Sequence, residues 1–327
     1  MIEEVVENIY KIEIPLPNSP LKFINSYLIK APERNLIIDT GMNRKECLDE
    51  MVAGLRELEV DLTETDFFIT HFHVDHLGLV SSLLTQDSMI YFNQPEADRL
   101  ERIRSGSVWP EMIDFTRSNG FPDNELEEIL HHHPGYKYLQ LRDPMPFHFL
   151  GDGDTLHVGD YRFNCVETPG HSKGHRCLYD PRKRIFFAGD HILNGLTPNI
   201  SLRSAEENPL RDYLASLDKV YPLEIELVLP GHGSLFKNFK TRIGELKQHH
   251  QERADEVTSI LRKGNKNAYE VASEMSWEIS CDRWDLFPTL QKWFAVGEAM
   301  AHLRYLEDMG RAQKGMEGQK IVYSPRE

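Results

Sequence analysis

The chain has 327 residues, of which 40% are hydrophobic and 27% charged, and its formal net charge is -15. This composition is typical of a globular protein with a full core and excludes a disordered or fibrous chain. The negative charge disfavours a protein that wraps nucleic acid or lies on an anionic membrane, because both tasks need a basic surface.

The N-terminal stretch MIEEVVENIYKIEIPLP is acidic, unlike a signal peptide, and no apolar run approaches the roughly 20 residues of a spanning helix. The cysteines are scattered without a CxxC pair, which favours reduced thiols over a disulfide framework. We therefore expect a cytoplasmic protein without a membrane partner.

The first half of the chain alternates between strand and helix patterns. VVENIYKIEI, FINSYLIKA and NLIIDTG are β-branched runs separated by Pro, Asn and Gly, which predicts strands. Apolar residues at three- and four-residue spacing from Arg44 to Leu58 predict a helix, and DFFIT returns to strand. MIYFN is a further strand, and Pro95 to His133 has a helical pattern.

The second half begins with two predicted hairpins, TLHVGDYRFNCVETPG and CLYDPRKRIFFAGD. A predicted helix from Pro209 to Val220 leads into the strand IELVLPGHG. Helical patterns then cover Thr241 to Leu261, Ala268 to Met275 and Phe287 to Met309, and GRAQKGMEGQKIVYSP predicts a small β-wing. A domain boundary is predicted near Lys240, which divides the chain into residues 1–239 and 240–327.

The stretch FFITHFHVDHLGLV carries His71, His73, Asp75 and His76 directly after an apolar run. Imidazole nitrogen and carboxylate oxygen suit zinc and neighbouring transition metals. On a strand, His71 and His73 would point to one face, and a turn into a helix at Val74 would bring Asp75 and His76 to a second point. A lone histidine is more often a surface residue, but this spacing favours two metal ions.

Further ligand-type residues occur at predicted strand ends beside glycine. They are His171 in ETPGHSKGH, Asp190 in FFAGDH and His232 in LPGHG. Glycine lets the backbone approach a metal-sized object closely, and loops at strand ends commonly carry catalytic groups. We expect two divalent metal ions as cofactors. Zinc is the favoured metal, although the same ligands also suit manganese and iron.

The order of HFHVDH, TPGH, GD and PGH resembles the metallo-β-lactamase superfamily, and IIDTG resembles an additional upstream motif of that family. The resemblance extends over about the first 235 residues. It implies an α+β protein with a four-layer αββα sandwich and a dinuclear site at one edge. The implied ligands are His71, His73 and His171 for the first ion and Asp75, His76 and His232 for the second, with Asp190 bridging both.

The resemblance also implies groups behind the ligands. Asp39 would hold a ligand imidazole through its other ring nitrogen, and His175 would support the ligands or have a structural role. His73 stands where the flavo-di-iron branch carries a carboxylate, which favours hydrolysis over oxygen or nitric oxide reduction. Asp190 stands where many zinc β-lactamases carry cysteine, which disfavours antibiotic hydrolysis.

The implied reaction is hydrolysis by a hydroxide held between the two metal ions, which would attack a carbonyl or phosphoryl group. Asp75 is the expected catalytic residue, because a free carboxylate oxygen could orient the hydroxide and later pass a proton to the leaving group. Activity should fall in acid as the histidines protonate.

Two segments bear on the substrate. The helical insertion at residues 95–147 carries Trp109, Met112, Phe115, Phe121 and Tyr136. These side chains could form a lid and line a substrate pocket, although packing in the core is favoured for any single one.

Residues 240–327 resemble the winged-helix-like appendage of the branch that includes the human lactamase-β-like 2 ribonuclease, by helix order and wing alone. Their basic and acidic side chains nearly balance, so we expect an element that packs beside the cleft or mediates a homodimer.

Several functions follow. A hydrolase of a small-molecule thioester or ester, similar to glyoxalase II, is favoured by the apolar insertion and the acidity, with an N-acyl homoserine lactonase as a variant. A metal-dependent endoribonuclease is favoured by the C-terminal resemblance and opposed by the charge, which disfavours nucleic acid as a partner without excluding it. A non-catalytic winged-helix regulator would not need the complete ligand set. Only a nuclease should lose activity steeply with salt.

Overall fold

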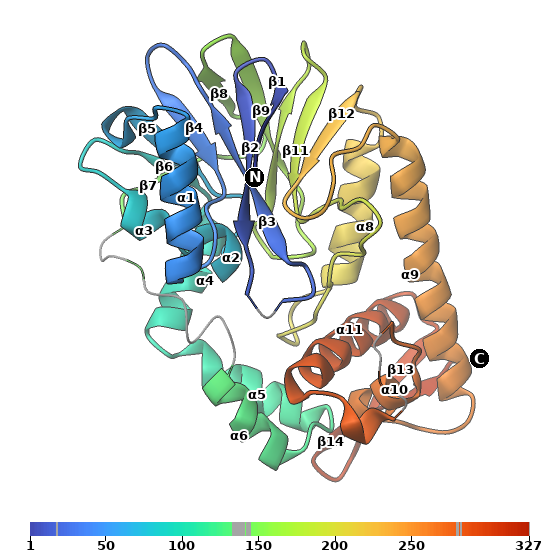
Figure 1. Ribbon diagram of the computed structural model, residues 1–327. Coiled ribbons are helices and arrows are strands. Elements are labelled where there is room, and N and C mark those ends of the chain that lie inside the picture. Colours follow the sequence, from blue (N-terminus) through green and yellow to red (C-terminus); the bar gives the residue numbers. More distant parts are fainter. Residues whose placement is uncertain (18, 133–140, 142–144, 279–280, 282, 327) are drawn as a thin grey trace.

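Two β-sheets lie face to face with helices on both outer sides (Figure 1). The structure is a computed structural model, and it describes the chain except residues 18, 133–140, 142–144, 279–280, 282 and 327. Among the described residues, no helix has the length and apolar character needed to cross a membrane.

The first sheet has seven strands in chain order: β1 (Ile2–Val6), β2 (Ile9–Pro15), β3 (Phe23–Ile29), β4 (Asn35–Ile38), β5 (Thr65–Phe68), β6 (Ile90–Phe92) and β7 (Phe147–Phe149). Strands β1 to β4 pair antiparallel, whereas β4 to β7 pair parallel. Parallel neighbours need crossover connections. These crossovers include α1 (Lys45–Glu57), the short helix η1 (Leu62–Glu64), α2 (Val74–Leu77) and α3 (Val80–Leu83).

The second sheet has five strands in the order β12-β11-β10-β9-β8. The predicted hairpins are confirmed as β8 (Thr155–Val158) with β9 (Tyr161–Glu167) and β10 (Arg176–Asp180) with β11 (Ile185–Gly189). Helix α8 (Pro209–Val220) crosses over to β12 (Leu227–Pro230), which pairs parallel with β11. The C-terminal ends of β9, β11 and β12 therefore meet at one edge.

The inner layer of the sandwich is apolar because alternate residues of the strands face it. In β9, Tyr161, Phe163 and Cys165 are buried and alternate with less buried residues. Phe163 and Phe187 of the second sheet pack in one cluster with Tyr27 of the first. Helix α1 covers the outer face of the first sheet, and α8 covers that of the second. The predicted four-layer αββα sandwich is confirmed.

Phe187→Ala is expected to lower the free energy of unfolding by about 3–5 kcal/mol, the usual cost of truncating a buried aromatic side chain. Phe187 is 1% exposed, and its ring centroid lies 5.2 Å from that of Tyr27 and 5.6 Å from that of Phe163. Urea unfolding would measure the change. Phe149→Ala is the matched control, since Phe149 is 44% exposed. Equal effects of the two changes would contradict this account of the core.

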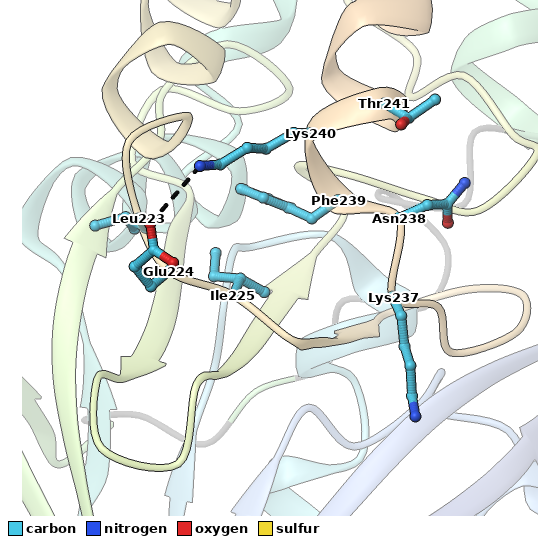
Figure 2. A pocket seen from close by; sticks show the side chains of 8 residues that line it. All are labelled: Leu223, Glu224, Ile225, Lys237, Asn238, Phe239, Lys240 and Thr241. Carbon is cyan, nitrogen blue, oxygen red and sulfur yellow. Dashed lines mark ion pairs between the residues drawn. The ribbon is translucent and has the colours of Figure 1, made fainter.

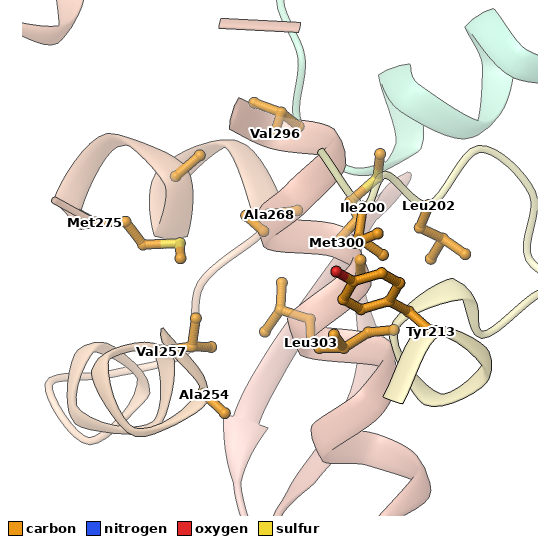
Figure 3. Close-up of a cluster of buried hydrophobic side chains, with 14 of the residues drawn as sticks. Ile200, Leu202, Tyr213, Ala254, Val257, Ala268, Met275, Val296, Met300 and Leu303 are labelled. Carbon is orange, nitrogen blue, oxygen red and sulfur yellow. The ribbon is translucent and has the colours of Figure 1, made fainter. Parts of the chain in front are cut away.

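The C-terminal segment consists of α9 (Phe239–Leu261), α10 (Ala268–Glu274), the short helix η2 (Trp284–Leu286), α11 (Thr289–Asp308) and the hairpin β13 (Ala312–Glu317) with β14 (Lys320–Pro325). The predicted helices and β-wing are confirmed. Side chains of α8, α9, α10 and α11 share one apolar cluster with Ile200 and Leu202 (Figure 3). The segment is thus packed against the second sheet through α8, whereas its winged-helix character and the boundary near Lys240 stay predictions.

The insertion is helical as predicted, with α4 (Gln94–Arg104), α5 (Val108–Ser118) and α6 (Asp123–His132). Trp109, Met112 and Phe121 are buried in the same cluster as the C-terminal helices, and the ring centroid of Phe121 lies 5.9 Å from that of Trp293 on α11. Packing in the core is therefore confirmed for these three side chains. Phe115 is partly buried against the cluster, and Tyr136 lies outside the described residues.

Candidate metal centre

The residues expected to bind metal follow the C-terminal ends of β5, β9, β11 and β12. Strand β5 ends at Phe68, so the expectation that His71 and His73 share one face of a strand is wrong: both lie in the loop that leads to α2. Helix α2 begins at Val74 as predicted, and Asp75 and His76 occupy its first turn. The loop places the two histidines by contacts with other segments, because strand geometry no longer applies there.

Three imidazoles form the first group of potential ligands. His71 Nε2 lies 2.9 Å from His73 Nδ1, and His171 Nε2 lies 3.0 Å from the same atom. Their ligand atoms all lie within 4.8 Å of one another, as the ligands of one ion must.

Asp75, His76 and His232 form the second group. His232 Nε2 lies 3.3 Å from Asp75 Oδ2, and His76 Nε2 lies 3.9 Å from that oxygen. Asp190 lies between the groups: its Oδ2 is 3.5 Å from His171 Nε2 and 3.6 Å from His232 Nε2. Its Oδ1 is 3.5 Å from His76 Nε2. The structure thus brings all the expected ligand residues together, with Asp190 between the two groups.

Hydrogen bonds at the far side of each ring decide which nitrogens can bind a cation. His171 Nδ1 lies 2.9 Å from Asn199 O, and His232 Nδ1 lies 3.0 Å from Phe23 O. A carbonyl oxygen can only accept, so each Nδ1 carries the proton and each neutral ring keeps a bare Nε2 toward the centre. Second partners that hold a ring in this way are typical of metal-bound histidines.

Several buried acceptor atoms at the centre have no hydrogen-bond partner among the described residues. They are His76 Nε2, His232 Nε2 and Asp190 Oδ1. Buried polar atoms are rarely left unpaired, since an unsatisfied group costs about 1–3 kcal/mol. The donor set of imidazole nitrogens and carboxylate oxygens therefore fits divalent cations, which would satisfy these atoms.

The charges of the two groups differ. Burial and neighbouring imidazoles hold the pKa of His71 well below its ordinary value and lower the pKa of His73 to about 3. Burial alone would also lower the pKa of His76, but the carboxylates of Asp39 and Asp190 outweigh burial and raise it well above its ordinary value. Burial would raise the pKa of Asp190, yet the neighbouring histidines hold it well below its usual range. The imidazoles of the first group are therefore neutral. The second group contains the carboxylate of Asp75 and lies beside that of Asp190, so it is anionic whenever its own imidazoles are neutral.

Asp39 anchors the ligand loop from behind. Its Oδ2 accepts from His76 Nδ1 over 2.7 Å and from Thr70 Oγ1 over 2.8 Å, and its Oδ1 accepts the Thr70 N–H over 2.9 Å. Thr70 Oγ1 in turn lies 3.0 Å from His71 Nδ1. One carboxylate therefore orients an imidazole in each group, which is the place expected for Asp39.

His175 supports the backbone of Asp190. Its Nδ1 lies 2.8 Å from Thr168 Oγ1, and its Nε2 accepts the Asp190 N–H over 3.1 Å. A Cβ at Gly189 would lie 2.7 Å from His175 Nε2, and one at Gly231 would lie 2.7 Å from Asp190 Oδ1. Both glycines therefore allow the close approach that the sequence patterns indicated.

Two supporting residues were missed by sequence reasoning. Thr70 links Asp39 to His71, and its position directly before HFHVDH was the available signal. Glu96 on α4 accepts the N–H groups of Phe72 and Gly174, which lie in the two loops that carry the first group. A glutamate near a helix start looks solvated in a sequence, so nothing local marked Glu96 as buried.

A cavity of about 250 Å³ lies elsewhere, between residues 223–225 and the start of α9 (Figure 2). Residues 223–225 precede β12, whereas His232 follows it, so the cavity is at the opposite end of that strand from the potential ligands. Lys240 Nζ and Glu224 Oε1 are 3.8 Å apart across it. This cavity is not part of the candidate metal centre.

Asp39→Asn is expected to weaken metal affinity by about 10-fold to 100-fold, the usual effect of changing a group that orients a ligand histidine. The neutral amide would replace the carboxylate that accepts from His76 and Thr70. Competition with a chromogenic chelator would measure the affinity. The control is Asp160→Asn, because Asp160 is exposed in the turn between β8 and β9. Unchanged affinity in Asp39→Asn would contradict this role.

The comparisons with known proteins agree with this geometry. The family model described as the metallo-beta-lactamase superfamily matches residues 20–232. The chain therefore belongs to the metallo-β-lactamase superfamily, which implies a metal-dependent hydrolase.

The proteins similar to this chain include two relatives named as thioesterases and a solved structure from Thermus thermophilus. A human protein named acyl-coenzyme A thioesterase MBLAC2 is 28% identical over 224 residues, which cover 65% of this chain and 74% of that protein. The atrochrysone carboxyl ACP thioesterase of Emericella nidulans is 27% identical over 248 residues, covering 76% and 63% of the two chains. The crystal structure of a metallo-beta-lactamase family protein from Thermus thermophilus matches with a TM-score of 0.81 at 26% identity, covering 99% of this chain and 100% of the other.

Proposed function

We propose that this protein hydrolyses a small-molecule thioester at a centre of two divalent metal ions, with zinc as the favoured metal. The observation that carries the proposal is the position of Asp190, whose two oxygens face ligand nitrogens of both groups at 3.5–3.6 Å. Two relatives named as thioesterases support thioesters over other substrates.

Under this proposal His71, His73 and His171 would hold one ion, Asp75, His76 and His232 would hold the other, and Asp190 would contact both. When bound, two divalent ions would supply a water nucleophile at neutral pH and polarise the scissile carbonyl. The protein's own contribution is to fix these side chains through Asp39, His175 and the carbonyl groups of Asn199 and Phe23.

Asp75 is the proposed catalytic residue. Its side chain is 20% exposed, against 9% for Asp190, so its carboxylate is the more accessible of the two. Burial would raise the pKa of Asp75, but His76 and His232 outweigh burial and hold it below its usual range. The carboxylate can therefore accept a proton from the attacking water at Oδ and orient it.

The direct test is a parallel assay of the metal-loaded protein with acyl-coenzyme A thioesters, S-lactoylglutathione, an acyl homoserine lactone and single-stranded RNA. Thioester turnover that a chelator removes is expected. Lactone cleavage without thioester turnover would replace the proposal by the lactonase variant. RNA cleavage alone, falling steeply with salt, would establish the nuclease instead.

A further inference from the structure

Two arginines lie on segments that contact the loops of the candidate metal centre. Arg99 lies on α4, and Arg203 lies in the segment between β11 and α8. Both are partly buried, yet neither forms an ion pair with any residue that the structure describes. Partly buried charges are normally paired, because desolvation is costly. Two partly buried guanidinium groups without an ion pair therefore need an explanation.

Arg203 is held in place by α11. Its guanidinium carbon lies 4.6 Å from the ring centroid of Trp293, and its Nη1 donates to Trp293 O over 3.4 Å. Gly297, one turn further along α11, leaves room for it, because a Cβ there would lie 2.8 Å from Nη1. These contacts orient the guanidinium group but leave most of its N–H donors free for another partner.

The segment of Arg203 leads directly from the metal centre. Asn199, four residues earlier, accepts from His171 Nδ1, and its side chain accepts from Ser201 Oγ over 2.6 Å. Leu202 N then donates to Gly297 O over 3.0 Å. The chain therefore runs from a contact with the potential ligand His171 to a contact with α11 within a few residues.

Arg99 belongs to a second element that supports the ligands. It lies one turn after Glu96 on α4, so the two side chains share a face of that helix. Glu96 accepts the N–H groups of Phe72 and Gly174. Phe72 directly precedes His73, and Gly174 comes shortly after His171. Helix α4 thus supports both ligand loops, and the segment of Arg203 supports the loop that carries His171.

The two arginines act on each other, and carboxylates act on Arg99. Burial, together with the charge of Arg99, lowers the pKa of Arg203 to about 9, so the two groups are close enough to repel each other. Arg203 nevertheless keeps contact with solvent. Glu207 is the carboxylate that acts most strongly on Arg99, and it also pairs with Lys173 at 3.9 Å. The carboxylates of Glu96 and Glu111 also act on Arg99, but neither forms an ion pair with it among the described residues.

We propose that Arg99 and Arg203 form an anion subsite, which binds a phosphate or carboxylate group on the thiol half of the substrate while the scissile carbonyl lies at the metal centre. Guanidinium groups match both anions because their planar donors form paired, charge-assisted hydrogen bonds. This inference rests on the proposed thioesterase function and adds the substrate class: thioesters whose thiol half carries an anionic oxygen group.

The kinetic test uses one acyl group on three thiols: phosphopantetheine, which carries a phosphate, glutathione, which carries carboxylates, and N-acetylcysteamine, which is neutral. Arg203→Gln and Arg99→Gln should each raise KM about ten-fold or more for an anionic thioester. The kcat for that thioester, and the kcat and KM for the neutral thioester, should stay within about two-fold of the wild-type values. A lower KM for the phosphopantetheine thioester than for the neutral one, lost in the variants, would show that the subsite binds phosphate. The same pattern for the glutathione thioester would show that it binds carboxylate. Arg203→Lys should restore part of the loss.

Controls separate this role from a structural one. Arg162→Gln removes an exposed arginine on β9 and should change nothing. Arg99 does not stack on Trp293, so a selective rise in KM for Arg99→Gln would not reflect loss of that packing. If the wild-type protein used all three thioesters with the same KM, or if both arginine variants behaved like the wild type, the subsite would be overturned while the thioesterase function stood.

Calorimetry with phosphopantetheine and with glutathione, on metal-loaded protein, tests the subsite without turnover. Binding to the wild-type protein that weakens about ten-fold or more in Arg203→Gln supports the subsite even if no thioester is hydrolysed. Equal binding to the two proteins, or no binding to either, overturns it. Failure of the proposed function and failure of the subsite are thereby distinguished.

Discussion

Asp190→Ala is expected to lower kcat/KM for the preferred thioester by about 1,000-fold or more, since a metal ion contributes several kcal/mol to catalysis and each ~1.4 kcal/mol is a factor of ten. The change removes the one side chain whose oxygens face both groups of potential ligands. The metal content should fall with the activity, because the remaining imidazoles would face each other without the bridging carboxylate.

The fold should survive this change. Asp190 follows the end of β11, outside the apolar cluster between the sheets, so circular dichroism and the urea midpoint of the metal-free protein should stay near those of the wild type. His73→Ala should act in the same way, as it removes the atom around which His71 and His171 converge. Asp160→Ala is the exposed control. Full activity in Asp190→Ala or His73→Ala would refute the dinuclear assignment.

Removal of metal is expected to abolish activity, and added zinc, manganese or iron should restore it. Plasma mass spectrometry of the loaded protein should find near two ions per chain, one for each group of ligands. A content near one ion per chain with full activity would contradict a dinuclear mechanism. Less than about half an ion per chain, with no uptake of added metal, would show that the histidine clusters have another role.

The same sample provides a pH test. Nearby carboxylates outweigh burial and raise the pKa of His76 and of His232, so protons compete with metal at these rings at a higher pH than at an ordinary imidazole. His71 and His73 have lowered pKa values and stay neutral to lower pH. One ion should therefore leave before the other on acidification, with the second group emptying first. Simultaneous loss of both ions would contradict this order.

Local patterns in the sequence were sufficient for much of the architecture. Helix α8 occupies the predicted Pro209–Val220, and both hairpins of the second sheet form where turn residues interrupt β-branched runs. These features depend on neighbours a few positions apart, through apolar periodicity and turn chemistry, so they can be read from one segment at a time.

The identities of the potential ligands were also accessible, because HFHVDH is too dense in ligand-type residues to be ordinary, and His171, Asp190 and His232 share a glycine context. Their grouping around Asp190 came from a family resemblance and not from spacing. Distances such as 3.5 Å from Asp190 to His76 are set only when two sheets pack together.

Tertiary structure alone decided the contacts between distant segments. Asp39 meets Thr70 and His76 because β4 and β5 are adjacent and parallel, and Phe23 O reaches His232 across the two sheets. Arg203 and Trp293 are brought together by the packing of α11, although 90 positions separate them. The sequence by itself determined which side chains could bind metal and which segments form strands and helices. Strand register and the packing of layers decided what those side chains touch, because such contacts depend on the whole core and leave no local pattern.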